Sequence, residues 1–493
     1  MRERIQAELS NFLKKEVLAP ALVREYNTGF NEMILLNKVY AIMLMKENII
    51  DRKAVKIILA GLEKVRQELK PQHLDAKYEE IYYNIEQALF KNIGVEVGGK
   101  LHTGRSRNDI YATMTRMQVR RSLWEVIERV IALQETLIKI ASENLETIIT
   151  GYTHMKPAQP ITLAHFFVAV TNALSRDFER LKNAYRTTNM SPYGAAALAG
   201  TSFPINRQLL MELLGFEKIL INTLDAVGAR DYVLEVEAAF TIMMANVSRI
   251  AHDLYIWATD EFGIIELGGE IAFSSSIMPQ KKNPETLEFA EAKAAHSAGA
   301  FISTFAAHKN SSFSFCMDLV ESLVMYWEAH SQVLQSLGLL LETIKYSKIN
   351  KERALECAKK NFSTVTALAD YLVVKFDIPF SKAHDIVGNM VAKVISEGSS
   401  TEGIKSFLLQ QTSKNILGKE LKVSDEEIQR VLDPSENIES KKVPGSPRKD
   451  SVKAMLNEAN RYIRNEKIWL KDEVKRVELA YAVIKDEEMK ISS

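Results

Sequence analysis

Three polar segments between long apolar stretches contain the side chains best suited to chemistry. The third segment is the most informative, and it reads Ser274-Ser275-Ser276-Ile277-Met278-Pro279-Gln280-Lys281-Lys282-Asn283-Pro284-Glu285. Small, flexible and cationic residues together are typical of a loop that closes over an anion and brings a hydroxyl and a positive charge to it. An unstructured linker is the alternative. Linkers rarely place two lysines and an asparagine between two prolines, so we favour a mobile closing loop over about residues 268–286.

The first polar segment, residues 98–109, reads "GGKLHTGRSRND" and leads into a long apolar-patterned stretch. Ser106, Arg107 and Asn108 would then lie at the start of a helix. Free backbone N–H groups and the positive end of the helix dipole add to these side-chain donors, and such a site suits a carboxylate. The alternative is an ordinary capped helix start whose charges face water.

The second polar segment, residues 151–160, reads "GYTHMKPAQP" and includes Thr153 and His154. An imidazole in a short connection bounded by proline can act as an acid or a base near neutral pH. An ordinary surface histidine is the alternative. No pair of histidines has metal-ligand spacing with a third ligand nearby, so the sequence predicts no metal and no other cofactor.

Long stretches without glycine or proline predict the elements that position these segments. They cover residues 105–150, 161–191, 230–262 and 300–337. A continuous helix over the first stretch would be roughly 70 Å long. Because that length exceeds an ordinary compact domain, we expect an elongated helical bundle.

The first long stretch has two apolar series on nearly opposite faces of the expected helix. One is Ile110, Met117, Trp124, Ile131, Ile138 and Leu145, and the other is Val119, Leu123, Val126, Val130, Leu133, Leu137 and Ile140. A helix that is apolar on two faces is buried on both. We interpret this as packing inside the subunit on one face and against other subunits on the other, which favours a homo-oligomer.

The whole chain reads as an all-α protein of three regions. We expect an N-terminal helical domain over residues 1–104, a long-helix bundle over 105–360 and a C-terminal helical domain over 361–493. The 63 basic and 63 acidic residues give no net field that favours nucleic acid or an anionic membrane. Two cysteines, Cys316 and Cys357, provide no disulfide framework, and no apolar run approaches a membrane span, so we expect a cytoplasmic protein.

Taken together, "SSIMPQKKNP" and "GGKLHTGRSRND" resemble the signature motifs of the fumarase–aspartase superfamily, and more narrowly those of the argininosuccinate lyase family. The resemblance continues through residues 194–215, 224–235 and 366–388 to the tail "ESKKVPGSPRKDSVKAML", so it covers roughly residues 90–455. It implies three helical domains and a homotetramer built around a twenty-helix core. Each active site would combine loops from three subunits.

The resemblance also implies a reaction and its residues. The reaction would be the reversible β-elimination of argininosuccinate to fumarate and arginine, the last step of arginine biosynthesis, with a small-molecule substrate and no nucleic-acid or membrane partner. Ser275 matches the base, Lys281 and Asn283 match the groups that hold the developing dianion, His154 matches the proposed acid, and Glu288 matches the carboxylate that orients it. The carboxylate-binding groups correspond to Ser106, Arg107, Asn108 and Thr153.

The chain departs from the family pattern where the amine half of the substrate is bound. Phe315, Val320 and Leu323 stand where the family usually has Tyr, Gln and Lys. Two interpretations follow: an argininosuccinate lyase that uses other residues, or a paralogous C–N lyase whose leaving amine is smaller or less polar. A third is a non-catalytic, crystallin-like structural protein, although Ser275 and Lys281 would have no purpose in a scaffold.

Overall fold

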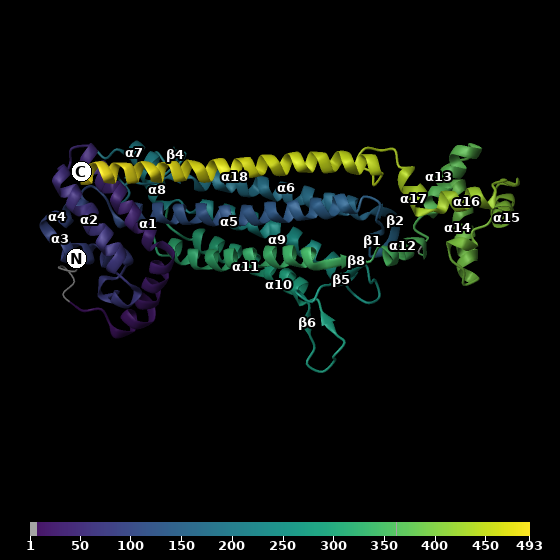
Figure 1. The fold of residues 1–493 in the computed structure, drawn as a ribbon, viewed down its shortest axis with the longest axis horizontal. Helices are drawn as coiled ribbons and strands as arrows, with labels where there is room; N and C mark the ends of the chain where they lie inside the picture. The colour runs from purple at the N-terminus through teal and green to yellow at the C-terminus, as the bar shows by residue number, and fades with distance from the viewer. Residues whose placement is uncertain (1–6, 361) are drawn as a thin grey trace.

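The computed structural model describes residues 7–360 and 362–493, and it shows an elongated molecule of long helices (Figure 1). A helical N-terminal region lies at one end and a smaller helical region, which contains α13 to α16, lies at the other. The predicted all-α class is confirmed. Strands occur among the described residues as short pairs only.

Five long helices form the central bundle: α5 (Arg107–Glu143), α6 (Leu163–Thr188), α9 (Asp231–Trp257), α10 (Glu285–His308) and α11 (Asp318–Tyr346). The helix α5 begins at a capping box, in which Ser106 and Asp109 satisfy each other's backbone N–H groups. It ends well before Thr150, so the predicted continuous helix over residues 105–150 is wrong at its C-terminal end. The segment that follows contains the β-branched pair Ile148-Ile149, which favours an extended conformation and begins strand β1.

Both apolar faces of α5 are buried, as the two series predict, but the cause differs from our interpretation. Val119 and Val126 of one series are fully buried, and Ile131 and Ile138 of the other are each 4% exposed. Within the same chain α5 packs against α6, α11, α18 and α1. The two faces are therefore covered inside one subunit, and they carry no information about an oligomer.

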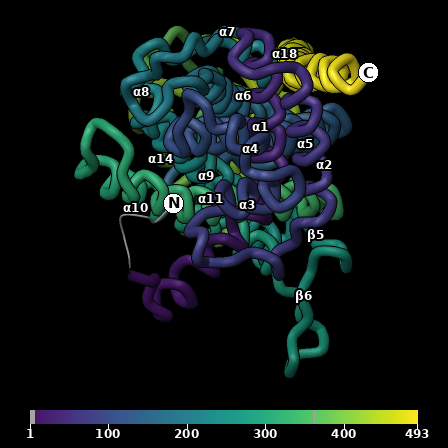
Figure 2. Tube along the Cα trace, turned by 90° about the vertical axis from the view of Figure 1, so that its left-hand side faces the viewer, coloured from purple at the N-terminus to yellow at the C-terminus, as the bar shows by residue number. Residues whose placement is uncertain are grey.

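The N-terminal region surrounds a second apolar core. Its helices are α1 (Ala19–Lys46), α2 (Arg52–Glu68), α3 (Ile81–Ile93) and α4 (Val95–Gly98), with α7 (Arg207–Leu213) and α8 (Thr223–Gly228) beside the bundle. Met33, Leu36 and Val39 on α1 are fully buried in this core, together with Leu210 of α7. The end-on view in Figure 2 shows α1 to α4 stacked over that end of the bundle.

The C-terminal region has a third core and a long returning helix. The third core is formed by α13 (Val365–Phe376), α14 (Phe380–Ser396), α15 (Ser406–Leu417) and α16 (Asp425–Leu432). Before them, α12 (Lys351–Lys360) packs against β1 and places Ala354 in the central core, and after them α17 (Pro434–Glu439) contacts α16 and β2. The last helix, α18 (Lys449–Ser492), instead runs back along α5 and α6, and its Ile484 and Ile491 join the N-terminal core (Figure 1). Our expectation of one C-terminal domain over 361–493 is therefore wrong for α18.

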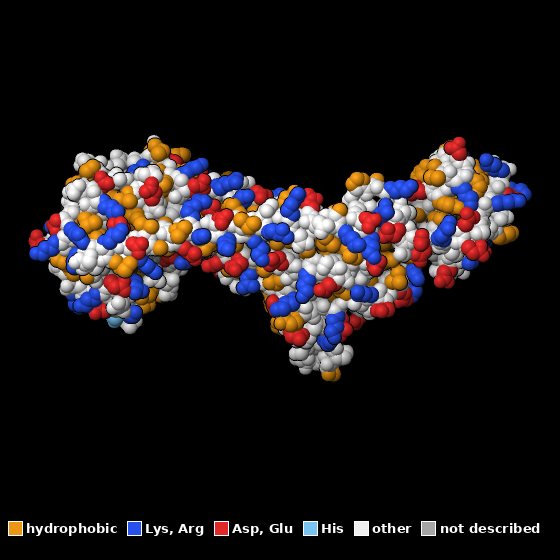
Figure 3. Space-filling view, turned by 45° about the horizontal axis from the view of Figure 1, so that its top comes forward, with side chains coloured by type: hydrophobic (Ala, Val, Ile, Leu, Met, Phe, Trp, Pro, Cys, Tyr) orange, Lys and Arg blue, Asp and Glu red, His pale blue; other side chains and the backbone are white. Residues whose placement is uncertain are grey.

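In the described part of the chain, four strand pairs connect or close these helices. They are β1 (Ile148–Thr153) with β2 (Lys156–Thr162), β3 (Met190–Ser191) with β4 (Lys218–Ile219), β5 (Ile265–Leu267) with β8 (Ser347–Ile349), and β6 (Phe273–Ser274) with β7 (Lys282–Asn283). The β3–β4 pair is parallel and the others are antiparallel. Charges of both signs are mixed over the face in Figure 3. Among the described residues, no helix has the length and apolar character to cross a membrane.

Candidate active site

The first polar segment forms the N-terminus of α5, as predicted. The Ser106 hydroxyl accepts the backbone N–H of Asn108 at 3.4 Å, and the Asn108 side chain donates to the carbonyl oxygen of Ala197 at 3.1 Å. Arg107 is half-buried and forms a 2.7 Å ion pair with Glu80. A guanidinium has five N–H donors, so this ion pair leaves donors for a carboxylate at the helix start.

Asp109 connects this helix start to the loop that contains Gly194 and Ala196. It is fully buried. One carboxylate oxygen accepts the Ser106 N–H at 3.2 Å, and the other accepts those of Gly194 at 3.0 Å and Ala196 at 3.1 Å. Burial raises the pKa of Asp109 to about 7, while these three N–H donors favour the charged form. The three N–H donors are directed at both oxygens, an arrangement that suits an ionised carboxylate, which only accepts hydrogen bonds.

Arg105 anchors the other side of the same segment. The residue is 7% exposed, and its guanidinium donates to the Asn37 side chain at 2.6 Å and to the Tyr82 hydroxyl at 3.3 Å and lies 4.8 Å from the Tyr40 ring centroid. Tyr82 in turn shares a 2.6 Å hydrogen bond with His102. Ser106, Arg107 and Asn108 are therefore flanked by two buried charges, each fixed to a different part of the fold.

The second polar segment forms the turn of the β1–β2 hairpin. Thr153 pairs with Lys156, and His154 and Met155 are the two turn residues, with φ angles of 54° and 57°. Two positive φ angles define a turn that normally takes Asn-Gly, and a non-glycine residue there stores backbone strain on the order of 1–3 kcal/mol. The turn therefore holds the His154 imidazole at an exposed tip.

The third polar segment is the connection of the β6–β7 hairpin, which projects from the bundle in Figures 1 and 2. The hydroxyl oxygen of Ser275 accepts the backbone N–H groups of Ile277 at 3.4 Å and Met278 at 3.1 Å. Lys281 is exposed, and the Asn283 side chain donates to Glu285 at 3.3 Å. Two N–H donors on one hydroxyl oxygen stabilise negative charge there, which a serine base requires.

Glu288 lies in the first turn of α10, directly after this hairpin, and it is exposed. Its proposed partner His154 lies on the β1–β2 hairpin beside α12, near the C-terminal region. Among the described residues, no hydrogen bond or ion pair joins the two side chains, which lie on different elements.

Nor does one chain bring the three polar segments together. The 37 residues of α5 separate the Ser106 segment from the region of the β1–β2 hairpin, a distance of about 55 Å at the rise of an α-helix. The β6–β7 hairpin projects from a third place along the bundle (Figure 1). A site that uses all three segments therefore needs more than one copy of the chain.

The three residues of the predicted amine side do lie together. Phe315, just before α11, and Val320 and Leu323 in its first turns line one cavity. The lining also includes Glu25 and Thr28 of α1 and Tyr111 of α5. Tyr111 follows Arg107 by one helical turn, so this cavity adjoins the anchored start of α5.

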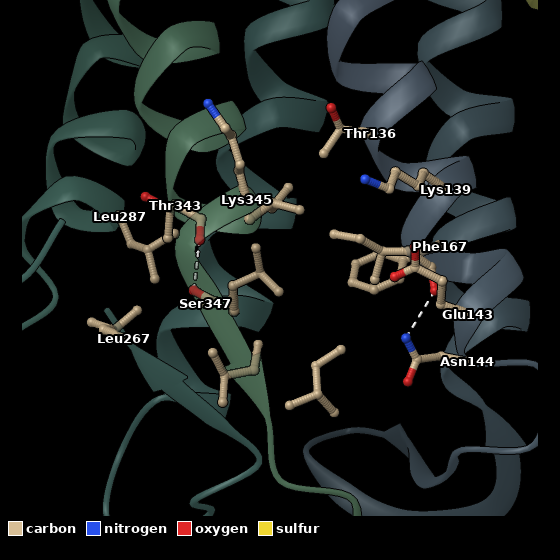
Figure 4. Close-up of a pocket in the computed structure, with 15 residues that line it drawn as sticks. Thr136, Lys139, Glu143, Asn144, Phe167, Leu267, Leu287, Thr343, Lys345 and Ser347 are labelled. Atoms are coloured by element: carbon tan, nitrogen blue, oxygen red, sulfur yellow. Dashed lines mark hydrogen bonds between the residues drawn. The ribbon is translucent and has the colours of Figure 1, made fainter. Parts of the chain in front are cut away.

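A second cavity, of about 240 Å³, lies inside the other end of the bundle. Figure 4 shows Lys139 and Glu143 of α5 facing Lys345 and Ser347 across it. Its lining contains none of the residues that the sequence predicts for the active site. We therefore assign it no part in the chemistry.

Sequence reasoning missed several residues that the structure connects to the site. Asp109 could have been found, because Ser-x-x-Asp at a helix start is a capping-box pattern. Arg105 stands in the first polar segment and Arg230 in the matching stretch 224–235, but the sequence does not show that they are buried, because burial of a charged side chain depends on elements that are distant in sequence. Glu25 lies in an N-terminal stretch without any motif.

Comparisons with known proteins agree on the class of protein. Residues 14–299 match the family described as "Lyase", and residues 362–439 match the one described as "Argininosuccinate lyase C-terminal". The chain is 40% identical to argininosuccinate lyase 1 of Shouchella clausii over 86% of both chains. It is 35% identical to argininosuccinate lyase of Methanocaldococcus jannaschii over 97% of this chain and 99% of that one.

A solved structure adds that the fold is shared over nearly the whole chain. The structure of EDDS lyase in complex with formate matches with a TM-score of 0.88 and 29% identity, and it covers 99% of this chain and 96% of that one. These matches define a lyase of the fumarase–aspartase type. The chain belongs to the argininosuccinate lyase family.

Proposed function

We propose that this protein is an argininosuccinate lyase, which eliminates arginine from argininosuccinate and releases fumarate. The observation that carries this substrate is the identity of 35–40% to curated argininosuccinate lyases over most of both chains. Retention of the serine, lysine and asparagine of the third segment supports an active enzyme rather than a crystallin-like scaffold.

The proposed chemistry assigns one role to each segment. Ser275, as an alkoxide held by loop N–H groups and Lys281, removes the Cβ proton next to a succinyl carboxylate. Asn283 and Lys281 stabilise the dianion that develops on that carboxylate. The Cα–N bond then breaks, the Cα–Cβ double bond of fumarate forms, and His154, oriented by Glu288, donates a proton to the leaving nitrogen. Ser106, Arg107, Asn108 and Thr153 hold the carboxylates.

The direct test is to incubate the purified full chain with argininosuccinate and follow fumarate by its ultraviolet absorbance. We expect equal amounts of fumarate and arginine. Absence of both, from a protein with the expected helical content by circular dichroism, would contradict the assignment of this substrate.

We infer that the working enzyme is a homotetramer in which each site combines segments from three subunits. The separation of the segments along one chain supports this inference. Ser275→Ala and Arg107→Ala would each inactivate a different segment of the site. Equal mixing of the two variants, with subunit exchange, should restore about one quarter of wild-type activity, because one site in four would receive both intact segments. Mixtures with no recovered activity after exchange would contradict shared sites.

A paralogous C–N lyase is the second candidate, and the apolar lining formed by Phe315, Val320 and Leu323 favours it. The same fold occurs in a protein named EDDS lyase, so the fold by itself does not restrict the substrate to argininosuccinate. The triple variant Phe315→Tyr, Val320→Gln, Leu323→Lys tests this candidate. Higher turnover of argininosuccinate by the variant would support a wild-type amine half less polar than arginine, and unchanged or lower turnover would count against it.

A further inference from the structure

The second cavity, between α5 and the β5–β8 pair, has the size and lining of a binding site for a small apolar molecule (Figure 4). Its volume of about 240 Å³ exceeds the roughly 150 Å³ of an engineered apolar cavity that binds benzene. Voids of this size are uncommon in close-packed protein interiors. The apolar lining includes five buried side chains, which are Phe167, Leu254, Ile265, Leu287 and Ile344.

Charged groups of both signs stand at the edge of this cavity. Lys139 and Glu143 lie one turn apart on α5, and both exposed side chains face the space in Figure 4. Lys345 of α11 also belongs to the lining, but its ammonium group forms a 3.5 Å ion pair with Glu342, which does not. One cation and one anion on α5 therefore remain for a ligand.

The two ends of the β6–β7 hairpin lie on the wall of the same cavity. Leu267 belongs to β5, which leads into the hairpin, and Leu287 lies in the first turn of α10, directly after it. Figure 4 shows Leu267 and Leu287 across the space from Lys139 and Glu143. A molecule that fills the cavity would therefore contact both ends of the segment that carries the proposed base.

Two hydrogen bonds connect these ends to α11, which also lines the cavity. The backbone N–H of Gly268 donates to the carbonyl oxygen of Tyr346 at 3.1 Å, and a Cβ atom at this glycine would lie 2.5 Å from that oxygen. The Thr343 hydroxyl donates to the Thr286 hydroxyl at 2.9 Å. A shift of the hairpin stem would therefore move the cavity wall, and a ligand that supports the wall would restrain the stem.

We propose that this cavity binds a small apolar α-amino acid and that the bound ligand restrains the β6–β7 hairpin. The apolar side chain occupies the interior, the α-carboxylate lies at Lys139 and the α-ammonium group lies at Glu143. A ligand that binds the conformation with the hairpin projecting better than a closed one stabilises the projecting state. Turnover then falls, because the serine base acts only when the loop closes over the substrate.

The first test is calorimetric titration of the unmodified full chain with four probes. L-leucine has all three recognised groups, whereas 4-methylpentanoate lacks the amino group, 3-methylbutylamine lacks the carboxylate and glycine lacks the apolar side chain. The two probes with a missing charge should bind about three- to fivefold more weakly than L-leucine, the size expected for one exposed ion pair. Glycine should not bind measurably. Equal binding of L-leucine and any other probe, or no binding of L-leucine at millimolar concentration, would overturn the proposal.

Two variants assign each charge to its residue. Lys139→Gln should weaken binding of L-leucine about three- to fivefold and leave 3-methylbutylamine unaffected, because that probe has no carboxylate. Glu143→Gln should weaken L-leucine to the same degree and leave 4-methylpentanoate unaffected. The matched controls Lys471→Gln and Glu128→Gln change exposed residues outside the lining and should bind all probes as the unmodified chain does. Equal losses for every probe in either cavity variant would contradict the assignment.

A variant that fills the space tests the cavity itself. Ile140→Phe enlarges a side chain of the lining, so binding of L-leucine should be lost while the helical content by circular dichroism keeps its wild-type value. Ile468→Phe makes the same change at an exposed position of α18 and should bind L-leucine normally. Retained binding in Ile140→Phe would place the ligand elsewhere and overturn the proposal.

Kinetics test the effect on the hairpin. Saturating L-leucine should lower kcat for argininosuccinate about fivefold, at the lower end of the usual coupling between two sites. KM should stay nearly unchanged, and Ile140→Phe should abolish the inhibition. A rise in KM with constant kcat would show competition at the active site and would contradict the proposal.

Limited proteolysis separates failure of this proposal from failure of the proposed reaction, because it needs no turnover. Trypsin can cleave after Lys281 and Lys282, which are exposed in the hairpin. L-leucine should slow this cleavage, because a restrained stem opens less often. Binding of L-leucine with an unchanged rate of cleavage would overturn the regulatory role, whether or not argininosuccinate is a substrate.

Discussion

The start of α5 and the β6–β7 hairpin carry complementary parts of the proposed chemistry, and they are held in opposite ways. Ser106, Arg107 and Asn108 stand between two buried charges that connect them to α1, α3 and the Gly194 loop. The hairpin projects from the bundle, Ile277 at its tip is 82% exposed, and the hydroxyl of Ser275 contacts amides of the same loop.

This difference separates binding from chemistry. A carboxylate site gains from rigidity, because donors that are already oriented lose little entropy when the anion arrives. A serine base must be surrounded by positive charge and protected from water only while the substrate is bound. We therefore expect substitutions at the helix start to reduce stability and binding together, and substitutions in the hairpin to reduce turnover alone.

The largest effect should come from the hairpin. Ser275→Ala removes the proposed base, so kcat should fall about 10²–10⁴-fold. The midpoint of thermal unfolding should stay at the wild-type value, because the hydroxyl is bonded within an exposed loop. Ser276→Ala, a change of its exposed neighbour, is the matched control and should retain activity. Full activity of Ser275→Ala would contradict the proposal that the β6–β7 hairpin provides the catalytic base.

Asp109→Asn should produce the opposite pattern. An asparagine has one carbonyl oxygen, so at least one of the three N–H donors would face an amide nitrogen, at a cost of about 2–3 kcal/mol in the free energy of unfolding. KM should rise with it, because Ser106 and Asn108 lose their support. Urea denaturation and steady-state kinetics measure the two effects. The control Asp318→Asn changes an exposed residue in the first turn of α11, and it should lower the free energy of unfolding by about 0.5 kcal/mol at most. Equal losses of stability in the two variants would contradict a special role for Asp109.

The smallest effect concerns the pH dependence of the anchored region. Burial, together with the charges of Arg105 and Arg107, lowers the pKa of His102 to about 4. Between pH 6.5 and 4 the unfolded chain binds a proton that the folded chain does not, so this histidine reduces stability as the pH falls. Since its side chain is 40% exposed, we expect a loss of about 1 kcal/mol rather than the full value of the shift.

His102→Gln should flatten this part of the pH profile. The measurement is the urea midpoint at pH 7 and at pH 5 for both proteins. His384→Gln, which removes an exposed histidine in α14, is the control and should keep the wild-type slope. A wild-type slope in His102→Gln would show that the anchored region does not sense pH through this residue.

Much of the fold and of the site could be predicted from the sequence. The stretches without glycine and proline correspond to long helices, and the Ser106 segment forms a helix start. The end of α5 could not be predicted correctly. The β-branched residues at 148–150 favour a strand, but that strand is stable only because it pairs with residues 160–162, which a local pattern does not show. Val452, Leu456, Ala459 and Ile463 have heptad spacing, and they form part of the buried face of α18.

The roles of buried charged residues could not be predicted. Arg105, Asp109 and Arg230 stand in segments that the sequence singles out, but their burial, and the contacts of the half-buried Glu25, come from partners far along the chain. The same holds for the two faces of α5, since the apolar pattern predicts burial but does not identify the partner. Whether α6, α11 and α18 or another subunit covers those faces depends on tertiary packing.

The sequence by itself determined the helical class, the family and the identity of the three polar segments, because these depend on local periodicity and on residue types at fixed spacing. Only the tertiary structure decided that the segments lie at separate places on one chain and that Glu25 and Arg230 share a cavity with Phe315, Val320 and Leu323. The physical reason is that desolvation and charge pairing are set by neighbours in space, and a linear pattern does not contain them.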